Sequence, residues 1–597
     1  MNILRRSGPD AIRRYAKLSP HLKKRRHRTQ LLLATALTSG LLLYETNDSV
    51  HESFKHTYLT MKRVSIVGQA TIRCFYHYKR TLNKEYATRV SRMEALNACH
   101  LKCARITLKA LEWNGGVYIK LGQHIGAMTY LLPREWTETM VPLQDQCPQS
   151  TMEEINEMFL TDLGQSIDDL FDEFDPRPIG VASLAQVHVG KLKASSYNGK
   201  SVEGGNGDVE KVAIKCQHPT LKNFIPLDVI LTKTVFKFMD LVFPEYPLTW
   251  LSDELQSSIY VELDFTKEAQ NAIKTSNYFK NFENLTALKV PKVVSAQKRI
   301  LIMEYVGGKR LDDLKYLDDS NISRAEVSAC LSHIFNNMIF TPNVGIHCDP
   351  HGGNLAIRYR DNSKKKLSWK DKILGNWGDN KSENRHNFEI ILFDHGLYRY
   401  PTTQMRRDYA KFWLALLDQK QDKMKYYAKK FAYITDEEFP MLAAAITGRS
   451  IDTALHLDIS KKRSQEEMDV MSEGIIEGTL LADLMGILSK IPSSVLLILK
   501  TNDLTRHLDE CLQNPLGPER TFLIMSQYCA KTVYDEECEN IQIRDKRWSL
   551  IWSWHKIVAW LRYERRQKQL VIFDLYLLGK QTINLIFMHP LWNMICI

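Results

Sequence analysis

The feature that most constrains the fold is a loop over residues 343–358 that carries an aspartate and an asparagine at a fixed spacing. It reads NVGIHCDPHGGNLAIR, with Asp349 and, five residues later, Asn354. Gly352 and Gly353 between them allow a tight turn. Phosphoryl transfer needs a carboxylate that orients a nucleophile and an oxygen donor that binds magnesium. The loop therefore favours a fold that brings a metal and a nucleotide together.

A second acidic motif follows Asn354 after 40 residues. The sequence FEIILFDHGLYR predicts an apolar strand that ends at Asp394, followed by His395 and Gly396. At this position the carboxylate can hold the metal that bridges nucleotide phosphates, and the glycine allows a sharp turn. The residues before the strand are polar and rich in Lys and Asn. We expect a solvated surface insertion over 358–388, with lipid or partner binding as the alternative.

A lysine and a group of acids precede the loop in the chain. EKVAIKCQHP begins as a strand and places Lys215 where an ammonium can reach phosphates. ELDFTKEAQNA is predicted to be a helix that carries Glu262, Asp264 and Glu268. A lysine of this kind needs a helix carboxylate as its partner. Glu262 and Glu268 lie about 240° apart around a helix, so they cannot both face Lys215, and we favour Glu268.

The order of these elements resembles that of protein kinases, and the resemblance implies an α+β, bilobal fold with Mg²⁺ and ATP or ADP as ligands. The amino-terminal lobe is expected over 170–306 and the mostly helical carboxyl-terminal lobe over 307–540. LIMEYV resembles the linker that binds adenine, which makes Glu304 and Val306 candidate nucleotide contacts. The candidate catalytic residues are Asp349, Lys215, Glu268 and Glu262, and the candidate metal ligands are Asn354 and Asp394.

No glycine-rich GxGxxG sequence precedes Lys215; the chain reads PIGVASLAQVHVGKL instead. Together with the KxGQ motif at 120–123 and the ExD motif at 262–264, this sequence makes the chain similar to the UbiB or aarF-domain (ADCK-type) family of atypical kinase-like proteins. LLILKTNDLTRHLD resembles the mitochondrial branch of that family. Gly180 and Val181 stand where alanines are usual, which leaves open the nucleotide preference and turnover that the loop implies.

The resemblance assigns nucleotide binding to Ala182 and Ser183, and gating to Lys120, Gly122 and Gln123. Helices around the KxGQ motif fold over the site in this family, which implies that protein substrates are excluded. The function implied is that of an ATPase or a small-molecule or lipid kinase, associated with coenzyme Q and lipid homeostasis. A membrane lipid or a quinone-type small molecule is the expected partner. The alternative is a catalytically weak, nucleotide-gated scaffold or lipid-binding protein.

The amino terminus has the composition of a mitochondrial targeting segment. Residues 1–30 hold ten Lys or Arg and one acidic residue, whereas the whole chain has a net charge of +11. The remaining chain is nearly neutral, which argues against nucleic-acid binding. An uncharged run follows, and 31–48 is expected to be a transmembrane helix, with a secretory signal or a buried or interfacial helix as alternatives. The expected location is the mitochondrial inner membrane, with the body in the intermembrane space.

Two further segments are predicted to be helical. The first, residues 50–165, is an extension that contains the KxGQ motif, with a stop at Asn114-Gly115-Gly116 and another at Pro133. The second, residues 541–597, is an apolar tail. We expect this tail either to pack on the core or to contact a membrane surface.

Overall fold

The computed structural model describes residues 48–127, 132–144, 147, 149–193, 211–219, 221–244, 249–350, 352–361, 386–447, 486–487, 490–514 and 518–588. The chain divides into two compact units, residues 1–70 and 71–597. Helix α3 (Asp48–Leu82) begins in the first unit and ends in the second. The expected targeting segment, 1–30, and all but the last residue of the expected anchor, 31–48, lie outside the described residues.

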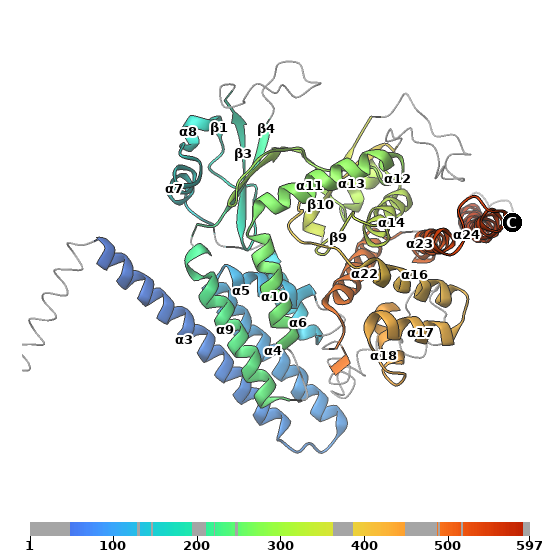
Figure 1. Ribbon diagram of the computed structural model, residues 1–597. Coiled ribbons are helices and arrows are strands. Elements are labelled where there is room, and N and C mark those ends of the chain that lie inside the picture. The colour runs from blue at the N-terminus through green and yellow to red at the C-terminus, as the bar shows by residue number, and fades with distance from the viewer. Residues whose placement is uncertain are drawn as a thin grey trace, which may run out of the picture. The chain divides into compact units, whose positions relative to one another are not determined.

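The second unit begins with helices that form a layer of their own. They are α4 (Arg89–Asn114), α5 (Val117–Ala127), α6 (Arg134–Met140) and the 3-10 helix η1 (Val141–Gln144). The next helices, α7 (Met152–Leu163) and α8 (Ile167–Leu170), lie beside the sheet described below. Helix α4 ends at Gly115, whose φ of 65° lies in the region that favours glycine. Helices α9 (Leu221–Val242) and α10 (Thr249–Glu262) also pack on α5 (Figure 1). Residues expected in the amino-terminal lobe thus contribute to the helical layer.

A six-stranded sheet forms the amino-terminal lobe, with strand order β1-β3-β4-β7-β6 and β2 paired to β3. Its strands are β1 (Phe171–Phe174), β2 (Gly180–Val181), β3 (Ala185–Leu192), β4 (Lys211–Gln217), β6 (Val293–Ala296) and β7 (Ile300–Glu304). All pairings are antiparallel, and Lys215 lies opposite Val187 on β3 and Leu301 on β7. Helix α7 packs its buried Ile155 and Phe159 against this sheet.

The predicted single helix through Glu262 and Glu268 is wrong. Helix α10 ends at Glu262, and α11 (Phe265–Phe279) begins after Asp264. The Asp264 carboxylate accepts a hydrogen bond from the Thr266 amide at 3.2 Å and so caps α11. Because the two glutamates lie on different helices, the angular argument that they cannot both face Lys215 does not apply.

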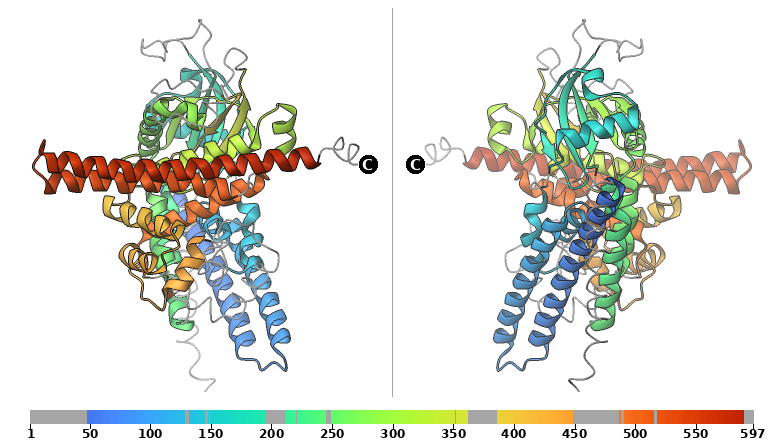
Figure 2. Two further views of the ribbon diagram at one scale, coloured as in Figure 1. Left: turned by 90° about the vertical axis from the view of Figure 1, so that its right-hand side faces the viewer. Right: turned by 90° about the vertical axis from the view of Figure 1, so that its left-hand side faces the viewer.

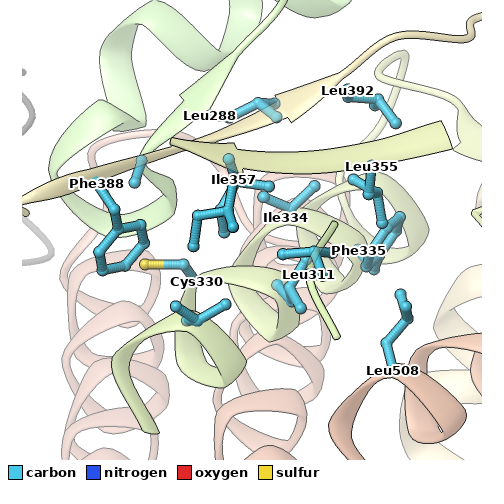
Figure 3. Packing of buried hydrophobic residues seen from close by; sticks show 14 of the residues in the cluster. Leu288, Leu311, Cys330, Ile334, Phe335, Leu355, Ile357, Phe388, Leu392 and Leu508 are labelled. Atoms are coloured by element: carbon cyan, nitrogen blue, oxygen red, sulfur yellow. The ribbon is translucent and has the colours of Figure 1, made fainter. Parts of the chain in front are cut away.

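The carboxyl-terminal lobe combines two small sheets with a set of helices. Strands β5 (Leu288–Lys289), β11 (Phe388–Leu392), β10 (Leu355–Tyr359) and β8 (Lys309–Arg310) form one sheet in that order, and β12 (Tyr398–Arg399) pairs with β9 (Ile346–His347). The helices are η3 (Lys280–Phe282), α12 (Glu283–Thr286), α13 (Leu314–Asp319), α14 (Arg324–Phe340), η4 (Gly352–Asn354), α16 (Thr403–Leu417), α17 (Gln421–Ala432), α18 (Phe439–Thr447) and α22 (Ser493–Cys511). Figure 3 shows the core between β10, α14 and α22, where Ile357, Ile334 and Leu508 belong to one buried cluster.

The predicted insertion joins two neighbouring strands. Strands β10 and β11 pair antiparallel, with Tyr359 opposite Phe388. The strand ends that border the predicted insertion therefore lie side by side. Residues 362–385, which make up most of the predicted insertion, lie outside the described residues.

The last two described helices, α23 (Pro518–Arg544) and α24 (Leu550–Met588), pack along each other. Figure 2 shows them as a long hairpin. The expected boundary at residue 540 lies inside α23, and Arg566 of α24 forms an ion pair with Asp418 after α16 at 2.5 Å. The tail is therefore joined to the carboxyl-terminal lobe along one face of α24 rather than forming a separate domain.

Candidate functional site

Lys215 lies at the centre of a first charged cluster. Strand β4 presents its ammonium to Glu268 of α11 at 2.6 Å and to Asp394 at 3.0 Å. The ammonium also lies 5.2 Å from the centroid of the Phe265 ring, at the start of α11. Glu268 is thus the carboxylate that holds Lys215. Phe265 packs beside it in a small core with Leu301, which fixes α11 against the sheet.

Burial and the surplus of acid set the protonation of this cluster. Burial opposes the charged form of Lys215, but Asp394 and Glu268 outweigh it and raise its pKa. Burial raises the pKa of Glu268 to about 7 despite Lys215. Burial also disfavours the Asp394 carboxylate, yet Lys215 and the Gly396 amide hold its pKa well below the usual range. The Lys215 ammonium therefore pairs with two carboxyl groups, and of these Glu268 titrates near neutral pH.

Lys120 of the KxGQ motif lies in a second charged cluster. Its ammonium contacts Glu262 at 2.9 Å and Asp349 at 3.3 Å. Burial opposes its charge, but Glu262 and Asp349 outweigh that effect and raise the pKa of Lys120. Glu262 therefore belongs to the Lys120 cluster and not to the Lys215 cluster. The KxGQ helix α5 reaches the catalytic loop directly.

Lys500 completes the second cluster and was not among the predicted site residues. It lies on α22, and its ammonium is 2.9 Å from Oδ1 of Asp349. The two oxygens of Asp349 thus face two different lysines, Lys120 and Lys500. Its only signal in the sequence is its place in LLILKTNDLTRHLD, the segment that resembles the mitochondrial branch. Nothing in that resemblance assigns a role to the lysine.

His347 connects the catalytic loop to the metal motif. Its Nδ1 accepts a hydrogen bond from the Asp349 amide at 3.2 Å, so Nε2 carries the proton and donates to the Asp394 carbonyl at 2.9 Å. The side-chain nitrogen of Asn354 donates to the Asp349 carbonyl at 3.0 Å. The backbone carbonyl of Asn354 accepts a hydrogen bond from the Phe393 amide at 3.0 Å. These bonds hold the loop and the end of β11 in register.

Asn354 and Asp394 fit a magnesium ion that is shared with a nucleotide. The Asn354 amide nitrogen faces its own loop, which leaves the side-chain oxygen for a metal. The Asp394 side chain is 32% exposed, more than the other acids of the two clusters. No group of three or more His, Cys, Asp or Glu side chains in the described part of the chain could hold a metal. The protein thus offers two oxygen donors, as at sites where phosphates complete the shell.

His395 is a structural residue. It is buried, and its ring nitrogens contact the Tyr398 hydroxyl at 2.9 Å and the Leu392 carbonyl at 3.2 Å. Burial lowers the pKa of His395 to about 3, so it is neutral. Its carbonyl accepts a hydrogen bond from Asn271 of α11 at 3.0 Å. These contacts position the turn in which the Gly396 amide donates to Asp394 at 2.8 Å.

The KxGQ helix also contacts the alanine-type loop. Ser183 donates to the Gln123 side chain at 3.4 Å, and Gln123 donates to the Leu143 carbonyl at 3.0 Å. A Cβ on Gly122 would lie 2.1 Å from Leu143 Cδ1, so any other residue here requires the helix or the Leu143 side chain to move. Ala182 accepts a hydrogen bond from His218 through its carbonyl at 3.0 Å. Ser183 is buried by these contacts, whereas the family resemblance assigns it to the nucleotide.

The linker residues Glu304 and Val306 lie where β7 leaves the sheet. The Glu304 side chain contacts Lys289 at 2.9 Å and accepts from the Lys292 amide at 3.0 Å. Val306 is buried against Ala356 and Ile391. Both side chains have structural roles, so any contact with adenine falls to the backbone.

Comparison with known proteins decides the family. A model of the ABC1 atypical kinase-like domain matches residues 142–428. The chain is 64% identical to ABC1 family protein MCP2 of Saccharomyces cerevisiae over 577 residues, which cover 96% of this chain and 97% of that protein. The chain belongs to the ABC1 family. The predicted UbiB/aarF resemblance and the predicted kinase-like fold are thereby confirmed.

Other ABC1 relatives extend the comparison to animals. The chain is 32% identical to AarF domain-containing protein kinase 1 of Mus musculus, with 84% of this chain and 86% of that protein covered. The solved structure of the Rv3197–erythromycin complex from Mycobacterium tuberculosis matches with a TM-score of 0.36 and 16% identity over 66% of this chain and 94% of that one. The match to the ABC1 domain model and the relatives named as kinases show a kinase-like enzyme at a coarse level.

The membrane anchor predicted from the sequence falls on residues that the structure does not describe, apart from Asp48. Among the helices that it does describe, none is long and apolar enough to cross a membrane.

Proposed function

We propose that this ABC1 family protein binds Mg²⁺ and ATP and transfers or hydrolyses the terminal phosphoryl group. The observation that carries the proposal is the Lys215–Glu268 ion pair, which lies with Asp394 in one cluster and is tied to Asp349 and Asn354 through His347. A lysine held by a helix carboxylate beside a metal-binding aspartate is what kinase-type chemistry requires.

Each residue has a distinct role in this proposal. Bound Mg²⁺–ATP supplies the phosphoryl group, and the bond between that group and ADP breaks as the new phosphorus–oxygen bond forms. Lys215 steadies the phosphates, while Asn354 and Asp394 offer oxygens to the metal. Asp349 orients the acceptor hydroxyl or water and takes its proton. The chain thus positions the reactants and balances their charge.

The acceptor that we propose is water or a small molecule such as a lipid headgroup or quinone precursor. Both oxygens of Asp349 face buried lysines, one from α5 and one from α22. A peptide would have to displace the lysine side chains from both helices to reach this carboxylate. A small acceptor needs only local movement of one lysine side chain.

Thermal unfolding with and without ligand tests the nucleotide proposal. Mg²⁺–ADP is expected to raise the midpoint of the wild-type protein, because a ligand that binds only the folded state stabilises it. The Asp394→Asn variant should lose most of the magnesium-dependent shift. Absence of any nucleotide effect on the wild-type protein would contradict the proposal.

A nucleotide-gated scaffold with weak turnover is the second candidate. The pairing of Asp349 with Lys120 and Lys500 favours it, because the carboxylate that would act on an acceptor is already occupied. The departure at Gly180 and Val181 from the alanine-type loop points the same way. If the double variant Asp349→Ala, Lys215→Ala restores function in cells that lack the protein, the scaffold is favoured over the enzyme.

We further propose that the protein acts at a membrane surface, and α24 supports this. Its Leu550, Trp554, Ile557 and Leu561 recur at helical spacing and are exposed. Basic residues lie along the same helix and before it: Lys546, Arg547, Lys556, Arg565 and Lys568. Exposed apolar and aromatic side chains with flanking cations suit the surface of an anionic bilayer.

Trp554→Ser with Leu561→Ser should reduce co-sedimentation with anionic phospholipid vesicles; unchanged sedimentation would contradict the proposal.

The compartment that we propose is the mitochondrial intermembrane space, with an anchor in the inner membrane. The basic composition of residues 1–30 supports a mitochondrial address. Protease added to mitochondria with a ruptured outer membrane should digest the body of the protein. Survival of the body under those conditions would place it in the matrix instead.

A further inference from the structure

Helix α22 lies outside the residues that the ABC1 domain model matches, yet it contacts the catalytic loop. The matched region ends at residue 428, whereas α22 spans Ser493–Cys511. Thr501 donates to the His347 carbonyl at 3.2 Å, and Leu508 belongs to the buried core of the carboxyl-terminal lobe. This helix is therefore fixed next to the loop, with Lys500 at the contact.

The catalytic loop supplies no lysine or arginine of its own. Between Asp349 and Asn354 the sequence is Pro-His-Gly-Gly. The transferring phosphoryl group carries negative charge on its outer oxygens, and that charge has to be matched by cations beside the nucleophile. Lys215 lies in the other cluster, with Glu268 and Asp394. The cations next to Asp349 come from α5 and α22.

Of the two lysines that contact Asp349, Lys500 depends on it more. Lys120 has Glu262 as a second carboxylate partner at 2.9 Å. For Lys500, the one ion pair formed with described residues is that with Asp349, and its side chain is 7% exposed. When Asp349 takes the proton of the acceptor, its carboxylate becomes neutral. A buried ammonium then needs a new anion, and the phosphoryl group arrives at that moment.

His124 gives a second indication of a ligand in this place. It follows Lys120 by one turn of α5, so the two residues share a helix face. It is 6% exposed, and its Nε2 has no hydrogen-bond partner among the described residues. Burial, with Lys500 and Lys120 nearby, holds the pKa of His124 well below its usual range, so the ring is neutral. A neutral, buried nitrogen without a partner is costly unless a bound group satisfies it.

We propose that Lys500 is a catalytic residue that binds the transferring phosphoryl group beside Asp349, and that α22 is part of the active site. The inference rests on the proposed phosphoryl-transfer function. Lys500 pairs with Asp349 in the free protein and passes to the phosphoryl oxygens as Asp349 accepts the proton. The ligand of this subsite is a phosphoryl group, held by Lys500 and completed by the nitrogen of His124.

The test compares binding of Mg²⁺–ADP with binding of Mg²⁺–ADP plus aluminium fluoride, a mimic of the phosphoryl group in transfer. The variants of the full chain are Lys500→Met, Lys500→Arg and the control Lys490→Met. Lys490 lies just before α22, is exposed and pairs with Glu438 at 2.6 Å. Lys500→Met should bind Mg²⁺–ADP as the wild type does, but bind the aluminium fluoride complex at least about tenfold more weakly. Lys500→Arg should recover part of that loss, and Lys490→Met should show none.

Each result decides between the two claims. If the wild type does not bind Mg²⁺–ADP, the proposed function fails and the inference fails with it. If the wild type binds both ligands and Lys500→Met binds both equally well, the inference alone is wrong and Lys500 is structural. If Lys500→Met binds the aluminium fluoride complex more tightly, the ion pair of Lys500 with Asp349 inhibits binding of the phosphoryl group, and the inference is also wrong. If Lys500→Met does not fold, as shown by its thermal transition, Lys500→Arg decides: full loss of the preference for the complex contradicts the inference, and partial retention supports it.

Discussion

The two buried charge clusters have similar chemistry but different origins. The Lys215 cluster is built from the strand, helix and loop elements of the kinase-like core, and it pairs one ammonium with two acids. The Asp349 cluster receives its lysines from α5, before the two lobes, and from α22, late in the carboxyl-terminal lobe. Under the proposed function, the kinase-like core binds the nucleotide, and the helices α5 and α22 control the acceptor side.

The largest expected effect comes from the metal ligand of the first cluster. Asp394→Asn should lower ATP turnover by at least about a hundredfold, because the variant loses the charge that holds the metal and one partner of Lys215. Turnover measured at saturating ATP over a range of magnesium concentrations checks this. If extra magnesium restores the full rate, Asp394 contributes only to metal binding, and the role of the first cluster is limited to binding the metal and the nucleotide.

The free energy of unfolding should show that Asp349 and Lys500 of the second cluster are coupled. Asp349→Asn leaves the Lys500 ammonium buried without a carboxylate and should cost about 3 kcal/mol of unfolding free energy. Adding Lys500→Met removes that charge and should recover a large part of the loss. Urea unfolding of both single variants and the double variant measures the coupling. Additive losses would mean that the 2.9 Å contact contributes nothing to stability.

The fit of α5 against η1 should depend on one glycine. The added methyl of Gly122→Ala would lie 2.1 Å from Cδ1 of the buried Leu143, so the helix or the side chain must move, at about 1–3 kcal/mol. The matched control is Gly126→Ala on the same helix, where the nearest atom lies at an ordinary 3.5 Å. Thermal unfolding compares the two. Equal stability of both variants would show that α5 is not closely held.

The smallest expected effect is a pH dependence of turnover. The pKa of Glu268 is about 7, so this carboxyl is largely protonated at pH 6 and ionised at pH 8. Only the ionised form pairs with Lys215, and turnover should therefore rise as the pH increases through about 7. The rise should be absent in Glu268→Gln, whose side chain does not titrate. An identical profile in both proteins would assign the pH dependence to another group.

Local spacing explains which candidate site residues could be identified from the sequence. Lys215, Asp349, Asn354 and Asp394 each lie in a short motif whose chemistry can be recognised without a structure, and the structure brings them together through Glu268 and His347. Capping was harder to foresee. The helix break at Asp264 depends on a side chain that bonds its own backbone, and such a residue is also tolerated within helices.

Long-range contacts explain what the sequence did not predict. Lys500 lies 151 residues after Asp349, and no local pattern distinguishes it from lysines on the surface. Its importance follows from burial, which only the packing of α22 on the carboxyl-terminal lobe creates. The position of α9 and α10 against α5 was missed for the same reason, because amphipathic helices do not specify which neighbour they will cover.

The most direct test of the division between the two clusters is titration of Mg²⁺–ADP onto the variants Lys215→Met and Lys120→Met. Lys215→Met should bind Mg²⁺–ADP at least about tenfold more weakly than the wild type, since a charged hydrogen-bond partner of the phosphates is lost. Lys120→Met should bind it with nearly wild-type affinity, because Lys120 belongs to the acceptor side. Equal weakening in both variants, or weakening in Lys120→Met alone, would contradict the account.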